Sequence, residues 1–193
     1  DRMLAREESL ISGKFDESEI RKVLPAVDTT GSDSAMLDNA LEFMIMGGMD
    51  PALAAMVLIP EPWEHNDTIS QEERDFYQYY ATMMEPWDGP ASIVFSDGDY
   101  LGAILDRNGL RPSRYYVMDD DRLILSSEVG VLALDESHVI CKERLHPGKM
   151  LLVDTVAGVI KSDEDIRIAF ESGAQMITGG SIAVNRPQMF LSW

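Results

Sequence analysis

The chain has 193 residues, of which 45% are hydrophobic and 26% are charged, a composition typical of a globular domain rather than of a disordered segment. Its net charge is −18, from 34 acidic and 16 basic residues. Such a surface repels phosphate backbones and the basic residues are scattered, so we expect no nucleic-acid partner. The longest apolar run, residues 51–60, is about half of what a membrane span requires, so we expect no membrane partner.

Cys141 is the chain's one cysteine, which excludes an internal disulfide and fits a reducing cytoplasm. It lies in a predicted strand, without the small, Gly-rich setting that exposes a nucleophile. A buried structural thiol is therefore favoured over a reactive one. The sequence opens on Asp1 rather than on an initiator methionine, which indicates a fragment of a longer protein.

The first part of the chain, up to about residue 89, has helical periodicity. Residues 32–48 predict a helix with Ser32 and Asp33 at its start, and one apolar stripe runs through Leu37, Ala40, Leu41 and Met44. Residues 50–60 open with Asp-Pro and are apolar all round, which predicts a buried helix.

A third helix is predicted over residues 70–87. It begins with a capping box, in which the Ser70 side chain and the Glu73 side chain each bond to the backbone of the other residue. Its core-facing stripe is predicted to contain Phe76, Tyr80, Met83 and Trp87.

After residue 89 the pattern changes to short strands joined by turns. Three hairpins are predicted, from residues 90–96 with 100–106, 114–118 with 122–127, and 149–154 with 158–162. Several of these strands are apolar on both faces, as in a sheet that is covered on both sides. Helices followed by an antiparallel meander predict a layered α+β domain.

Two acidic turns, residues 97–99 and 119–121, contain the oxygen ligands that hard cations prefer. Neither has the spacing of a calcium-binding loop, and solvated turns are the favoured interpretation. The histidines show no ligand spacing to one another; they are His65, His138 and His146. We expect no metal site.

Residues 106–114 read DRNGLRPSR, in which Asn108-Gly109 has two interpretations. The pair forms tight turns, and an amide with a bare backbone N–H can also line an oxyanion hole. Its place between two strand-like runs, followed by a proline, favours the turn. The candidates for a local ion pair that holds it are Asp106, Arg107 and Arg111.

The stretch DTTGSDSAMLDN, residues 28–39, places a polar turn directly before the first predicted helix. One interpretation is simple capping. The other is the wall of a pocket, where Ser32 and Asp33 would offer backbone N–H groups and a carboxylate to a zwitterionic amino acid.

Several stretches resemble the class II glutamine amidotransferase domain of the glutamate synthase family: GSDSAMLDNALEFMIMGG, PEPW, YYATMMEPWDGPASIVFSDGDYLGAILDRNGLRPSRYYV, LSSEVGVL and RLHPGKMLLVDT. The resemblance extends over residues 1–170 and implies a four-layer αββα sandwich of the N-terminal-nucleophile hydrolase type, with its N-terminal part missing. Residues 171–193 are interpreted as an atypical tail or the start of a missing continuation.

The resemblance also implies a glutaminase. In this family an N-terminal cysteine attacks the amide of glutamine, and the released ammonia passes to another domain, where 2-oxoglutarate is reductively converted to glutamate with FMN and an iron–sulfur cluster. The position that holds the glutamine α-ammonium matches Asp33, next to Gly31 and Ser32. Neither the nucleophile nor the family's oxyanion Asn-Gly matches a residue here, so no catalytic residue is assigned and we expect the fragment alone to be inactive.

The implied partners are glutamine and the remaining domains of the parent enzyme, and no cofactor is expected in this segment. The implied location is the cytoplasm, or a plastid for a plant-type source. Two alternatives stay open: another class II amidotransferase, or a non-catalytic relic that binds glutamine or regulates another protein.

Overall fold

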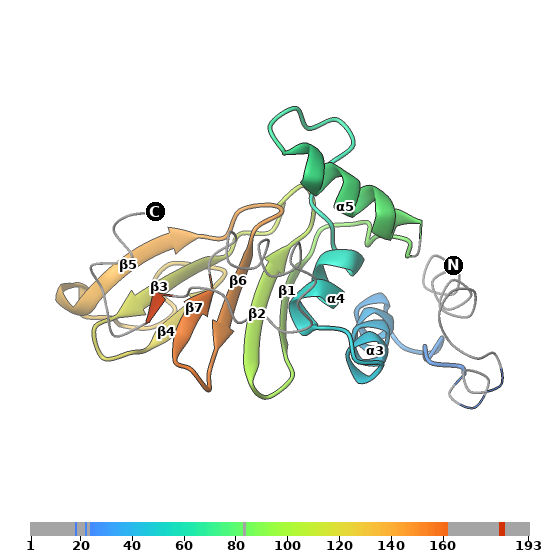
Figure 1. Cartoon of the computed structure of the whole chain (residues 1–193). Helices are drawn as coiled ribbons and strands as arrows, with labels where there is room; N and C mark the ends of the chain where they lie inside the picture. The colour runs from blue at the N-terminus through green and yellow to red at the C-terminus, as the bar shows by residue number, and fades with distance from the viewer. Residues whose placement is uncertain (1–17, 19–21, 23, 83, 162–181, 184–193) are drawn as a thin grey trace. The chain divides into compact units, whose positions relative to one another are not determined.

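The computed structural model describes residues 18, 22, 24–82, 84–161 and 182–183, and the chain divides into two compact units, residues 1–87 and 88–193 (Figure 1). The first unit contains the described α-helices and the second contains the described strands. Each unit is described by itself below.

The first helix of unit 1 confirms the predicted apolar stripe. It is α3, Asp33–Met46, and its buried residues are Leu37, Ala40, Leu41 and Met44. The next helix is α4, Pro51–Leu58, which begins with proline. The carboxylate of the buried Asp50 caps α4, because its Oδ1 accepts the N–H groups of Ala52 and Leu53 at 2.9 and 3.2 Å.

The third helix, α5, spans Gln71–Ala81, and both bonds of its predicted capping box are present. The predicted core face of this helix is wrong, since Tyr77 is the buried residue of the helix while Phe76 and Tyr80 are half-buried. Met83, the next predicted core residue, lies outside the described residues. Burial, followed by the nearby carboxylate of Glu61, raises the pKa of the Tyr77 hydroxyl. The helix also ends earlier than predicted. Trp87 follows it in a non-helical segment and donates its N–H to Leu58 O at 2.7 Å.

The described residues of unit 2 form two antiparallel sheets. The five-stranded sheet has the order β1-β2-β6-β7-β8, with bounds Ser92–Ser96, Tyr100–Leu105, Met150–Asp154, Val159–Lys161 and Ile182–Ala183. The three-stranded sheet has the order β4-β3-β5, with bounds Leu123–Ser126, Arg114–Met118 and Val139–Arg144. A 3₁₀ turn, η1 (Glu136–His138), directly precedes β5.

The three predicted hairpins are confirmed, but the predicted meander order of the strands is wrong. The chain leaves the five-stranded sheet after β2, builds the three-stranded sheet, and returns with β6, which pairs with β2 so that Gly102 lies opposite Leu152. An interior pair of this sheet is therefore formed by strands far apart in the sequence.

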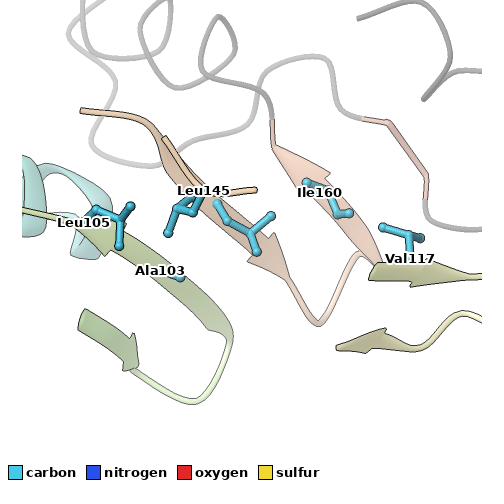
Figure 2. Close-up of a cluster of buried hydrophobic side chains, with 6 residues drawn as sticks. Ala103, Leu105, Val117, Leu145 and Ile160 are labelled. Carbon is cyan, nitrogen blue, oxygen red and sulfur yellow. The ribbon is translucent and has the colours of Figure 1, made fainter. Parts of the chain in front are cut away.

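One hydrophobic cluster joins the two sheets. Its buried members are Ala103, Leu105, Val117, Leu145, Leu151 and Ile160, five of which are labelled in Figure 2. Ile104 and Leu152 alternate with these residues, so they lie on the opposite face of the five-stranded sheet, and they are also buried. At these positions the sheet is thus covered on both faces, as its apolar strands predicted, whereas Val94 and Leu101 on the face of Ala103 are exposed.

Helices and antiparallel sheets together confirm a mixed α+β fold. Residues 171–193 lie outside the described residues, apart from the two residues of β8, which pair with β7. No helix among the residues that the structure describes is long and apolar enough to cross a bilayer.

Candidate functional site

The predicted substrate-binding residues lie together at the start of α3. Ser32 is the N-cap of this helix, with an extended backbone, and its Oγ accepts the N–H of Ala35 at 3.2 Å. The same Oγ lies 3.0 Å from the Oγ of Ser34. The capping interpretation is therefore confirmed for Ser32.

The turn before α3 is held by its own side chains. Asp28 Oδ1 accepts the N–H of Thr30 at 2.9 Å and its hydroxyl at 2.7 Å, and these bonds hold the pKa of Asp28 below its usual range. The Asp28 N–H donates to Asn39 Oδ1 at 3.0 Å, which ties the turn to the helix. Gly31 sits so close to the helix that an added Cβ would lie 3.2 Å from the Cβ of Ala35. These contacts give the site a fixed backbone.

Asp33 is the first residue of α3, and its side chain is exposed. Its Oδ1 accepts the N–H of Ser34 at 2.7 Å, and no described residue bonds to its Oδ2. The helix N-terminus stabilises a negative charge at this position. The carboxylate therefore retains an open oxygen suited to a cation such as an ammonium group.

The Asn108-Gly109 pair forms a turn, which is built around a buried aspartate. Asp106 is 2% exposed; its Oδ1 accepts the N–H of Ala91 and its Oδ2 accepts the N–H of Asn108, both at 3.0 Å. The N–H of Gly109 donates to the carbonyl of Asp106 at 2.9 Å, and Gly109 has a φ of 58°. An added Cβ at Gly109 would overlap the ring of Pro147. The turn therefore requires both the aspartate and the glycine.

The predicted ion pair at this turn is corrected by the structure. Arg107 pairs with Asp88, at 3.0 Å between Nη2 and Oδ1, while Asp106 bonds to backbone N–H groups instead of to an arginine. Asp88 lies 19 residues earlier in the chain, so the local sequence gave no signal for it.

The acidic turns use their carboxylates internally. Asp97 Oδ1 accepts the N–H groups of Asp99 and Tyr100, at 3.1 and 2.8 Å, and Asp120 pairs with Arg122 at 2.7 Å. Within the described ranges, no group of three or more His, Cys, Asp or Glu residues could hold a metal ion.

Cys141 lies in a strand, β5, as predicted, but its side chain is half-buried rather than buried. Burial, followed by the charge of Glu143, raises the pKa of its thiol, so the nucleophilic thiolate is disfavoured. Iron–sulfur clusters are held by several cysteine thiolates, and one cysteine does not fit such a cluster.

Comparison with known proteins identifies the family. The model of the class-II glutamine amidotransferases matches residues 1–175. The chain is 54% identical over 165 residues to the glutamate synthase [NADPH] large chain of Bacillus subtilis, and 46% identical to both the glutamate synthase [NADH] of Schizosaccharomyces pombe and the ferredoxin-dependent glutamate synthase 1 of Arabidopsis thaliana. Each match covers 86% of this chain but only 11%, 8% and 10% of the respective relative. The chain belongs to the class-II glutamine amidotransferase family.

Proposed function

We propose that this chain is part of the glutaminase domain of a glutamate synthase, and that Asp33 binds the α-ammonium group of glutamine. The observation that carries the assignment of Asp33 is its exposed carboxylate, which has one oxygen open to solvent on a turn fixed by hydrogen bonds. The 54% identity to a glutamate synthase large chain supports the choice of this enzyme over other class II amidotransferases.

The proposed reaction is hydrolysis of the glutamine side-chain amide, which releases ammonia for reductive transfer to 2-oxoglutarate and so forms glutamate. Asp33 would orient the substrate through a charge-assisted hydrogen bond, and Ser32 and Gly31 would hold the turn in place. The open side of the turn leaves room for a ligand, because the Asp33 side chain is exposed.

The nucleophile and the oxyanion donors would come from parts of the parent polypeptide outside these 193 residues. Cys141 is a poor candidate for the nucleophile because its pKa is raised, and Asn108-Gly109 is engaged in a turn around Asp106. FMN and an iron–sulfur cluster would likewise be held by other domains. In the intact protein the two units would contribute to a four-layer αββα sandwich.

The test is Asp33→Asn in the full-length protein. Asparagine keeps the shape of the side chain and removes its charge, so a charge-assisted bond worth about 1.5–3 kcal/mol is lost. This corresponds to a rise in the glutamine KM of roughly 10- to 150-fold. Glutamate formation from added ammonia should stay unchanged, because that route does not use the glutamine site.

The matched control is Asp38→Asn, which makes the same exchange at an exposed position of the same helix. An unchanged glutamine KM for Asp33→Asn, or an equal rise for Asp38→Asn, would refute the role of Asp33. The 193-residue chain alone is expected to hydrolyse no glutamine. A full-length protein that binds glutamine without hydrolysing it would instead support the non-catalytic relic.

A further inference from the structure

Asn108-Gly109 contains both groups of an intramolecular reaction that changes a chain covalently. In an asparagine–glycine pair, the glycine nitrogen can attack the side-chain carbonyl carbon of the asparagine. The new carbon–nitrogen bond closes a cyclic imide, the bond to the side-chain nitrogen breaks, and ammonia leaves with the proton of the glycine N–H. Water then opens the imide at either carbonyl, which gives aspartate or isoaspartate. Glycine favours the attack because it has no side chain to obstruct it.

The electrophile of this reaction is accessible. Asn108 is exposed, and its backbone N–H donates to Asp106 Oδ2 at 3.0 Å. Its side-chain amide makes no hydrogen bond to any residue that the structure describes. The side-chain carbonyl carbon is therefore open to attack, and the reactivity of the pair depends on the glycine nitrogen.

The nucleophile, in contrast, is held away from the reaction. The N–H of Gly109 donates to the carbonyl of Asp106 at 2.9 Å, which closes a β-turn with Asn108 at its third position. Attack requires this nitrogen to lose its hydrogen and to turn toward the Asn108 side chain, so the hydrogen bond must break first. Pro147 restricts that movement, because its ring lies so close to Gly109 that an added Cβ would overlap it.

Asp106 keeps this turn closed. Its buried carboxylate accepts the N–H of Ala91 with one oxygen and the N–H of Asn108 with the other. The N–H of Asp106 also donates to the carbonyl of Ala91 at 3.1 Å. These bonds fix the residue whose carbonyl holds the Gly109 N–H. Opening of the turn therefore requires several hydrogen bonds around one buried residue to break together.

We propose that Asn108 is a latent deamidation site, which reacts only while the turn around Asp106 is open. The rate of deamidation then equals the rate of the free Asn-Gly sequence multiplied by the fraction of time for which the turn is open. The sequence gives the pair its reactivity, and the folded turn suppresses it.

The product would prevent the turn from closing again. In isoaspartate the main chain runs through the former side chain, so one extra carbon separates residue 108 from residue 109. The bond from the Gly109 N–H to Asp106 cannot re-form in the same geometry. This turn lies in the connection from β2 to β3, which joins the five-stranded sheet to the three-stranded sheet. Each deamidated molecule would thus retain a lengthened connection between the two sheets.

The first experiment compares deamidation in the full-length protein with deamidation in a synthetic peptide of residues 104–112, at neutral pH and the same temperature. Mass spectrometry measures the mass increase on the fragment that contains residue 108, and enzymatic methylation measures its isoaspartate. The peptide has the same sequence but no folded turn. We expect position 108 to react at least about tenfold more slowly in the protein than in the peptide. Equal rates would overturn the proposal.

The second experiment opens the turn in the full-length protein. Asp106→Asn should speed deamidation at position 108 roughly 30-fold, with the rate of the peptide as the upper limit, because one of the two N–H groups loses its acceptor. The matched control is Asp97→Asn, which makes the same exchange in another turn and should leave the rate at position 108 unchanged. An unchanged rate in Asp106→Asn, or an equal acceleration by both variants, would overturn the proposal.

A third measurement needs no substitution and so does not depend on the folding of a variant. Low concentrations of urea increase the open fraction of the wild-type protein. Deamidation at position 108 and hydrogen exchange of the Gly109 amide should rise by the same factor, because both require the same N–H to leave Asp106. Deamidation that does not follow this exchange would overturn the proposal. These readouts do not use glutamine, so a failure of the proposed role of Asp33 leaves them unaffected.

Discussion

Asp106→Asn is expected to open the turn that follows β2. The Asp106 carboxylate is buried and uses its two oxygens on two separate N–H groups, those of Ala91 and Asn108, each at 3.0 Å. Asparagine has one oxygen and one NH₂ group, and an NH₂ group cannot accept a hydrogen bond. One of the two N–H groups must then face another donor.

The cost follows from the two bonds. Hydrogen bonds to charged groups contribute about 1.5–3 kcal/mol each, and the bond that remains would be a neutral one of about 1 kcal/mol. The lost bond alone therefore costs about 2 kcal/mol, which corresponds to roughly 30-fold faster local opening. Water can solvate the N–H of the exposed Asn108 better than that of the half-buried Ala91. The largest increase in amide hydrogen exchange is therefore expected where β1 begins.

Amide hydrogen exchange by mass spectrometry on peptides that cover residues 88–110 would measure this opening. Asp97→Asn is the matched control, because Asp97 also accepts two N–H groups but does so with one oxygen at an exposed turn. An asparagine oxygen can keep both of those bonds, so exchange there should change less than about threefold. An equal increase in exchange for Asp106→Asn and Asp97→Asn would refute the argument, which requires a buried carboxylate that uses each oxygen for a different N–H group.

Two further predictions concern turns of unit 2. Gly109→Ala should destabilise its turn by about 2–4 kcal/mol, because alanine is strained at a φ of 58° and its Cβ would overlap Pro147. The control is Gly98→Ala, at a φ of 107° with no atom near the added Cβ, which should cost only the backbone strain of about 1–2 kcal/mol. If amide hydrogen exchange showed equal destabilisation of the two turns, the predicted overlap with Pro147 would be contradicted. Asp119 Oδ2 lies 2.8 Å from His138 Nδ1, and this hydrogen bond and the charge of Asp119 raise the pKa of His138. The contact therefore contributes its full stabilisation below the ordinary pKa of 6.5, and this stabilisation is lost as the pH rises through the raised pKa. Asp119→Asn should return that pKa toward 6.5, as measured by exchange of the imidazole C2 hydrogen, and an unchanged pKa would refute the assigned cause.

The sequence predicted the helices well where local chemistry decides them. The stripe of α3 and the capping box of α5 depend on residues three or four positions apart, and the structure shows both. The error on α5 has a physical reason, because the helix carries four aromatic residues, Phe76, Tyr77, Tyr79 and Tyr80, and helical periodicity alone does not select which of them is most buried. Tyr77 lies about 100° around the helix from Phe76, where it interacts with Glu61, and it is the buried one.

The sheet partners could not be predicted in the same way. In the pairing of β2 with β6, Gly102 lies opposite Leu152, and the whole three-stranded sheet lies between these two strands in the sequence. No turn residues specify that contact. The pairing of Arg107 with Asp88 was missed for the same reason. Each hairpin, in contrast, carries its own turn signal, as Asp97-Gly98 does between β1 and β2.

The structure assigns the capping of α3 to Ser32, which the sequence could not separate from Asp33. Ser32 caps α3, so the helix does not need the Asp33 carboxylate for its first turn. Asp28 and Asp97 each accept two hydrogen bonds within their own turns, and Asp106 accepts one within its turn and one from Ala91, whereas Asp33 accepts one. Loss of the Asp33 charge should therefore cost the fold only its interaction with the helix dipole, about 0.3–1 kcal/mol. A large rise in the glutamine KM of Asp33→Asn, with the thermal unfolding temperature little changed, would consequently report on binding. A parallel loss of glutamine affinity and of thermal stability would instead assign Asp33 to the fold alone.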